Sequence, residues 1–239
     1  MEIPLDPAFI RSVLTDEHDA ATRDLAVDGV MPALERSQQR HEDRIATARD
    51  VSTLACRAGC TWCCHFSIDV RPAEVLSIVE FVDRTFAEAE RTRIRDEAQR
   101  NAALLDGLDD EQRMFRNVRC PFLAEGRCSI YTVRPQTCRN YHATDVAGCK
   151  QSYEEPGNLD IDPEFAPYVY QAGGAHVEAF SEALREAGYD VGAYEFNAAL
   201  SAAWSQPEAR RRFLDRKRPF RGLRGEDIPA EFQEIAEEP

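Results

Sequence analysis

Apolar positions recur at helical spacing over most of the chain, and this pattern fails in one internal stretch. Residues 72–86 are the clearest case, because Pro72 opens the segment and apolar side chains follow at intervals of three and four. The pattern continues more weakly to Gly107 and predicts one long helix. Further helices are predicted over residues 5–14, 16–50, 109–116, 163–187, 193–205 and 207–214, with a last short helix or tail over residues 226–239.

Proline and glycine mark the points where these helices are expected to change direction. Pro32 predicts a new start or a kink within residues 16–50. The pair Gly173-Gly174 predicts a break or a close helix contact. Residues 51–71 leave the helical pattern, and the alternation over residues 66–70 predicts one short strand.

Cysteines occupy the stretch that lacks helical periodicity. Four thiols, those of Cys56, Cys60, Cys63 and Cys64, fall within nine residues. The remaining cysteines follow on backbone interrupted by proline and glycine, and they are Cys120, Cys128, Cys138 and Cys149. Thiols at such short spacings either form disulfides or bind a soft metal.

Charge and targeting signals decide between these two chemistries. The formal charge is −14, which argues against a nucleic-acid partner. The first ten residues have no signal-peptide character, and no run of about 18 apolar residues predicts a membrane span. We therefore expect a cytoplasmic protein that does not bind a membrane. In that reducing compartment, clustered cysteines indicate metal or redox chemistry.

The cysteine spacing allows two kinds of metal site. One zinc ion takes four tetrahedral ligands, and Cys60 with Cys63 could supply two of them. Adjacent thiols such as Cys63 and Cys64 reach one small ion poorly, whereas an iron–sulfur cluster spreads its ligand positions over several irons. Two metal sites sharing the cysteines are a further possibility.

Histidines and arginines near the cysteines extend the candidate site. His65 and His142 are either additional ligands or supporting loop residues. Arg134 and Arg139 flank Cys138, where they could tune an anionic cluster or simply pair with a carboxylate.

One competing enzyme motif is present. Cys56-x3-Cys60-x-Trp62-Cys63 has the cysteine spacing of radical S-adenosylmethionine enzymes. The barrel of those enzymes needs repeated strand–helix units after the motif. The sequence offers one short strand followed by helices, and we reject this interpretation.

Several motifs in order resemble the YkgJ-like, or CxxCxxCC, family of zinc- or iron-chelating proteins. They are Cys60-x2-Cys63-Cys64, Cys120-Pro-Phe-Leu, Gly126-x-Cys128-x-Ile-Tyr131 and Arg134-Pro-x-x-Cys138-Arg, within about residues 51–150. The spacer between Cys56 and Cys60 is one residue longer than the family name specifies. The resemblance implies metal chelation through these cysteines and extends to Cys149. A similar cysteine region occurs in flagellin lysine methylases, so a protein-modifying activity is a further implication.

We therefore predict a mainly α protein in which an irregular cysteine-rich metal-binding core is braced by N- and C-terminal helices, with little β structure. The expected units are a helical segment 1–50, a cysteine-cluster domain 51–150 and a helical segment 151–239. The first functional hypothesis is an iron–sulfur protein, of the [4Fe–4S] type, for electron transfer or redox sensing.

The other hypotheses are a zinc-binding scaffold and a cluster-containing, methylase-like enzyme. The sequence does not decide whether the chain is an enzyme, but an enzyme is expected to show a polar pocket outside the cysteine cluster. A protein partner or an electron carrier is expected in either redox role. The basic stretch over residues 210–224 either pairs with the chain's own carboxylates or docks an acidic partner.

Overall fold

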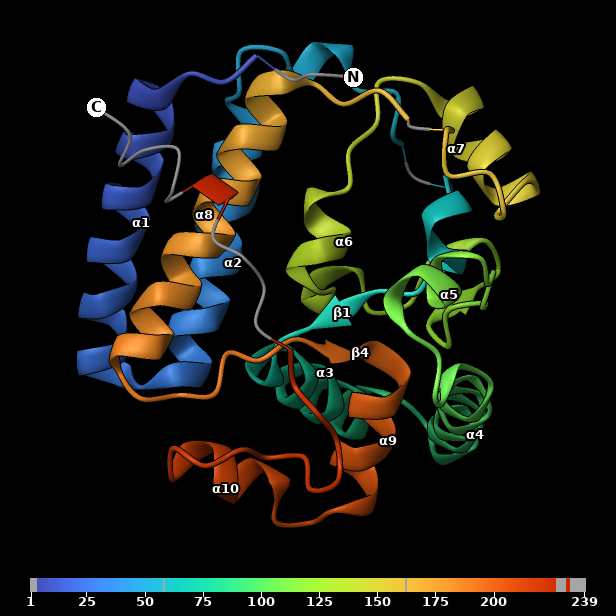
Figure 1. Ribbon diagram of the computed structural model, residues 1–239. Coiled ribbons are helices and arrows are strands. Elements are labelled where there is room, and N and C mark those ends of the chain that lie inside the picture. The colour runs from blue at the N-terminus through green and yellow to red at the C-terminus, as the bar shows by residue number, and fades with distance from the viewer. Residues whose placement is uncertain (1–3, 58, 162, 227–230, 233–239) are drawn as a thin grey trace.

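A computed structural model describes residues 4–57, 59–161, 163–226 and 231–232. Helices make up 62% of the described residues and strands 5%, which confirms the mainly α fold. Of the ten α-helices within the described residues, seven form two groups, and the other three lie in the cysteine region (Figure 1).

The first group is a bundle of three long helices that lie side by side (Figure 1). They are α1 (Pro7–Asp28), α2 (Val30–Ala46) and α8 (Pro167–Glu186). The predicted boundary near residue 15 is wrong, because α1 continues through it to Asp28. The chain instead turns at Gly29, whose φ of 78° favours glycine, and Pro32 lies in the first turn of α2.

Helix α8 also differs from its predicted form. It passes through Gly173 and Gly174 without a break. A β-carbon at Gly173 would lie 1.6 Å from Asn140 Oδ1, and one at Gly174 would lie 2.2 Å from Phe232 Cε2. The two glycines therefore serve close packing, which is one of the two roles that the sequence left open.

The second group contains α3 (Pro72–Thr85), α4 (Glu88–Leu105), α9 (Phe196–Ser205) and α10 (Ala209–Leu214). Pro72 and Glu74 open α3 as predicted, and Glu74 accepts the Arg71 N–H over 2.9 Å in a capping box. The predicted continuation to Gly107 is wrong. The chain becomes extended at Phe86 and restarts as α4, with the Phe86 ring packed edge-on against Phe81.

Strands are short and few among the described residues. β1 (Asp69–Val70) pairs antiparallel with β4 (Tyr194–Glu195), and β2 (Leu123–Ala124) pairs with β3 (Arg127–Cys128). The predicted strand after the first cysteines is therefore confirmed. The described segments contain no succession of strand–helix units, in keeping with the rejection of a radical-enzyme barrel.

The cysteine region is more helical than its pattern of prolines and glycines predicted. Between irregular segments it contains short 3₁₀ turns and three short α-helices. The α-helices are α5 (Asp110–Met114), α6 (Gln136–Asn140) and α7 (Val146–Glu154), and the turns are Val51–Thr53, Trp62–His65 and Tyr131–Val133. Two of the helices carry cysteines, Cys138 on α6 and Cys149 on α7.

The main hydrophobic core draws on all parts of the chain. Leu34 from the first segment, Phe122 from the cysteine region and Leu200 from the last segment belong to one buried cluster. The unit boundaries at residues 50 and 150 stay a prediction. Most of the expected C-terminal helix or tail lies outside the described residues, which include only positions 226, 231 and 232 of it.

Candidate metal centre

The first cysteine segment is anchored by the backbone of a distant loop. The N–H of Ala55 donates to the carbonyl of Ala143 over 3.0 Å, and the Cys56 thiol lies 3.8 Å from the same oxygen. Cys63 and Cys64 follow on the 3₁₀ turn Trp62–His65, which packs against Tyr153 of α7. This turn therefore places two adjacent thiols next to α7.

The second cysteine segment runs beside the first. The Cys120 N–H donates to the Cys64 carbonyl over 2.8 Å, and the Val118 N–H donates to the His65 carbonyl over 2.7 Å. Cys128 lies opposite Leu123 in the β2–β3 hairpin. These bonds bring together cysteines that are more than fifty residues apart in the sequence.

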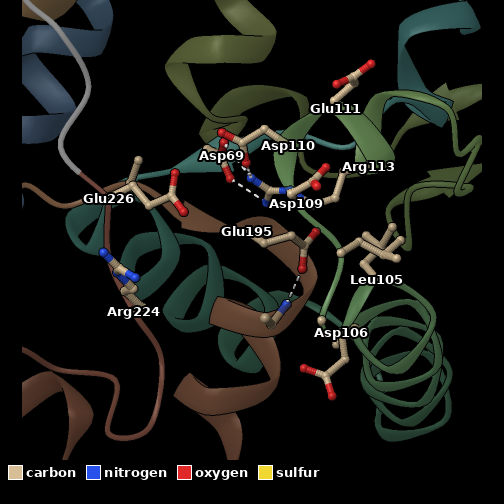
Figure 2. Close-up of a pocket in the computed structure, with 15 residues that line it drawn as sticks. Asp69, Leu105, Asp106, Asp109, Asp110, Glu111, Arg113, Glu195, Arg224 and Glu226 are labelled. Carbon is tan, nitrogen blue, oxygen red and sulfur yellow. Dashed lines mark hydrogen bonds and ion pairs between the residues drawn. The ribbon is translucent and has the colours of Figure 1, made fainter.

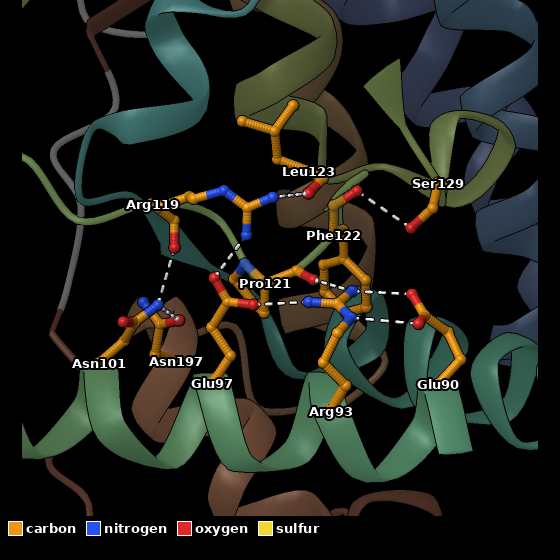
Figure 3. A network of polar contacts seen from close by, with 10 residues as sticks. All are labelled: Glu90, Arg93, Glu97, Asn101, Arg119, Pro121, Phe122, Leu123, Ser129 and Asn197. Carbon is orange, nitrogen blue, oxygen red and sulfur yellow. Dashed lines mark hydrogen bonds and ion pairs between the residues drawn. The ribbon is translucent and has the colours of Figure 1, made fainter. Parts of the chain in front are cut away.

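A polar network on α4 holds the loop that carries Cys120 (Figure 3). Arg93 donates to the Pro121 carbonyl over 2.9 Å, and Asn101 donates to the Arg119 carbonyl over 2.9 Å. Glu97 pairs with both arginines, Arg93 and Arg119. This network therefore holds the loop by two of its backbone carbonyls.

Helix α6, which carries Cys138, is held from two sides. Its first N–H, that of Gln136, donates to the buried carboxylate of Glu74 over 2.6 Å. The Thr137 hydroxyl donates to the Asp69 carbonyl over 3.1 Å. The start of α3 and strand β1 therefore position the Cys138 thiol.

Five thiols act on one another electrostatically. We call Cys63, Cys64, Cys120, Cys128 and Cys138 the five-thiol group. Burial, with a smaller contribution from Cys64 and Cys128, raises the pKa of Cys120 to about 12. Burial raises the pKa of Cys138 well above its ordinary value, and neighbouring thiols of the group add to the shift. Joint ionisation is thus unfavourable unless a cation offsets it.

The remaining cysteines form a three-thiol group, which consists of Cys56, Cys60 and Cys149. Burial raises the pKa of Cys149 to about 11, and Cys56 and Cys60 add to the shift. Cys56 also acts on Cys63, so the two groups adjoin. The structure thus places all eight predicted cysteines in one region, divided five and three.

Within the five-thiol group the adjacent pair is asymmetric. The Cys63 thiol hydrogen-bonds to Cys64, which raises the pKa of Cys63 and lowers that of Cys64. Cys64 is therefore the thiol that gives up its proton most readily, and the thiolate is the form that binds a metal.

The donor set fits a soft metal by its chemistry. All eight cysteines are free thiols, and they are half-buried or buried. Within the described residues, no three histidine, cysteine, aspartate or glutamate side chains are already placed to hold a metal ion. The raised pKa values of Cys120 and Cys138 favour their protonated thiols, and a metal that bound them would release these protons.

The two candidate histidines lie at the edge of this region. The His65 ring contacts Tyr153 with centroids 4.8 Å apart, and its Nδ1 is buried without a hydrogen-bond partner. Burial and the nearby charge of Arg134 lower the pKa of His142. Metal binding by either ring stays a prediction.

Both arginines that flank Cys138 pair with one carboxylate. Glu42 Oε1 accepts from Arg134 over 2.8 Å and from Arg139 over 2.5 Å. The arginines also act on Cys128, where they oppose the effect of burial on the thiol pKa. The pairing with a carboxylate is thus observed, and the tuning of a bound cluster stays a prediction. Glu42 itself carries no sequence signal, because more than ninety residues separate it from its partners.

An acidic pocket of about 460 Å³ lies outside the thiol groups (Figure 2). It borders α5, the end of α4 and strands β1 and β4, and Arg113 pairs with Asp69 across 3.0 Å. Seven carboxylates line it: Asp69, Asp106, Asp109, Asp110, Glu111, Glu195 and Glu226. This carboxylate site was not predicted from the sequence, although the acidic run over residues 106–111 was a usable signal.

Fold and site together define a mainly helical protein with a cysteine-based metal-binding region. Residues 55–159 match the family CxxCxxCC, described as "Putative zinc- or iron-chelating domain". The search of curated proteins and the search of solved structures found no match. Among the described helices, none has the length and apolar character needed to cross a membrane.

Proposed function

We propose that the protein binds a [4Fe–4S] cluster through four thiolates of the five-thiol group and uses it for electron transfer or redox sensing. The observation that carries this proposal is the gathering of five half-buried thiols, two of them adjacent, from separate segments. One zinc ion takes four ligands at about 2.3 Å and has little use for an adjacent pair. A cluster offers ligand positions on several irons.

The chain's own residues prepare this site in three ways. The α4 network and the Cys64–Cys120 backbone bond fix the loops that present the thiols. Cys64, with its lowered pKa, is the first thiolate available. Arg134 and Arg139 supply positive charge beside an anionic centre. When bound, the cluster supplies a one-electron couple, and a cytoplasmic electron carrier or protein partner is the proposed counterpart.

Metal analysis tests the proposal directly. Protein purified without oxygen is expected to contain about four iron and four sulfide per chain, as the proposed cluster does, with a broad absorption that bleaches with dithionite. About one zinc per chain in a colourless, redox-silent protein would overturn it. That result would favour the zinc-binding scaffold, in which the ion stabilises the fold alone.

A protein-modifying enzyme is the second candidate function, and the acidic pocket favours it (Figure 2). The pocket is polar and lies outside the cysteine groups, as expected for an enzyme. Its carboxylates suit a cationic group such as the ammonium of a lysine side chain. Asp69 also connects the pocket to α6, through the bond from Thr137.

Peptide binding tests this second function. A lysine-rich peptide is expected to bind the wild-type protein, and the double variant Asp106→Asn/Glu111→Gln should bind at least threefold more weakly. The control is Asp16→Asn/Asp19→Asn, which removes two exposed carboxylates from α1. An equal loss of peptide affinity in both double variants would show that only net charge matters, and it would contradict a specific site.

A further inference from the structure

A residue outside the matched segment pairs with two arginines of the cysteine region. Glu42 lies on α2, before residue 55, and its Oε1 is shared by Arg134 and Arg139. The side chains of these arginines are 7% and 4% exposed, whereas that of Glu42 is 38% exposed. One carboxylate thus offsets two largely buried positive charges.

The two arginines are held independently of Glu42. Arg139 donates to the carbonyls of Arg134 and Thr132, over 2.9 and 2.5 Å. Arg134 donates to the Tyr131 carbonyl over 3.0 Å and lies over the Tyr131 ring, 3.7 Å from its centroid. Removal of the Glu42 charge therefore leaves both guanidiniums in place.

Glu42, Arg134 and Arg139 form a charged triad, and its arginines affect the thiols electrostatically. Arg134 and Arg139 both act on Cys128, which belongs to the five-thiol group. With Glu42 ionised the triad carries a net charge of +1, and without it the charge is +2. A cluster bound by four thiolates is anionic and becomes more so on reduction, so positive charge nearby favours the reduced form.

From this arrangement we propose that Glu42 is a positioning residue that holds down the reduction potential of the cysteine-bound centre by cancelling half of the positive charge of Arg134 and Arg139. The inference rests on the proposed cluster and deepens that function, since it assigns control of the centre to a helix outside the matched segment.

Anaerobic redox titration of the iron-loaded protein tests the inference. Glu42→Gln is expected to raise the potential, with at least a tenfold change in the reduction equilibrium, or about 59 mV for one electron. Arg134→Gln should shift it in the opposite direction. The double variant Glu42→Gln/Arg134→Gln restores a net charge of +1 and should return close to the wild-type value.

The matched control is Asp43→Asn, which removes one exposed charge at the next position of the same helix. It should leave the potential unchanged, and thermal denaturation of every variant reports folding separately. If the wild type holds a cluster and Glu42→Gln matches Asp43→Asn, the role of Glu42 is wrong and the proposed function stands. If the wild type holds no cluster, the proposed function itself fails and the inference falls with it.

If Glu42→Gln does not retain the cluster, the reduction potential of Arg134→Gln is the test. A potential equal to or above that of the wild type in Arg134→Gln would overturn the inference.

Discussion

The backbone N–H of Cys120 lies 2.8 Å from the carbonyl oxygen of Cys64. This bond joins the two cysteine segments by main chain, so that their proximity does not depend on the thiols themselves. A second backbone hydrogen bond, from the Val118 N–H to the His65 carbonyl, joins the same two segments. The backbone of the two cysteine segments is therefore already paired before a metal binds. We expect metal binding to order mainly the cysteine side chains.

The division of the thiols predicts unequal effects of cysteine substitution. Cys64→Ser removes the thiol with the lowered pKa in the five-thiol group and is expected to abolish most metal binding. Cys149→Ser changes the three-thiol group and should retain more than half of the metal. Metal content per chain, measured after anaerobic purification, checks this. Equal loss in the two variants would show that the groups act as one site.

The α4 network predicts that Asn101 stabilises the protein. Asn101→Ala loses the bonds to the Arg119 carbonyl and to Asn197 Oδ1, and it leaves the buried Asn197 oxygen without this partner. The expected loss in the free energy of unfolding is about 1–3 kcal/mol, measured by urea denaturation. Arg84→Ala is the control, because it breaks only an exposed pair with Glu80 worth about 0.3–0.5 kcal/mol. Similar losses in both variants would contradict the role of Asn101.

Gly173 is predicted to be essential for the contact between α6 and α8. Gly173→Ala places a β-carbon on Asn140 Oδ1, and this overpacking should cost about 1–3 kcal/mol in unfolding free energy. Gly157→Ala has open space around it and should change stability by less than about 0.5 kcal/mol. Denaturant titration of the two variants checks the difference. A stable Gly173→Ala protein would mean that α6 moves away at little cost.

The burial of His41 predicts that the folded protein loses stability in mild acid. The ring is buried, and neither nitrogen has a hydrogen-bond partner. Burial, with Arg139 and other nearby cations, lowers its pKa to about 3 from 6.5. Below pH 6.5 the unfolded chain therefore binds a proton that the folded protein does not, so stability falls as pH falls.

The comparison with His41→Gln isolates this effect. From pH 7.5 to 5.5 the wild type should lose roughly 1 kcal/mol more unfolding free energy than the variant, which has no ionisable group at this position. Denaturant titrations at both values measure the loss. Parallel pH profiles for the two proteins would show that His41 does not titrate on unfolding. His176 is also held neutral by burial and is present in both proteins.

The sequence predicted the parts of the fold that local chemistry determines. Pro72 and Glu74 begin α3 as expected, and the cysteines lie together as their spacing indicated. The break at Phe86 was missed because neither glycine nor proline marks it, and ring packing against Phe81 accompanies it. Glu42 was missed because its contacts are non-local, and the division of the thiols depends on burial that spacing does not encode.

The pairing of β1 with β4 has a consequence for synthesis on the ribosome. Asp69 follows the first cysteines, yet its strand partner Glu195 is made fifty-seven residues after Cys138. At about 5–20 residues per second, this interval lasts roughly 3–11 s. During that time the thiols of the five-thiol group have already been synthesised, while the fold that shields them is incomplete. Early oxidation or capture of a wrong metal thus competes with closure of the fold.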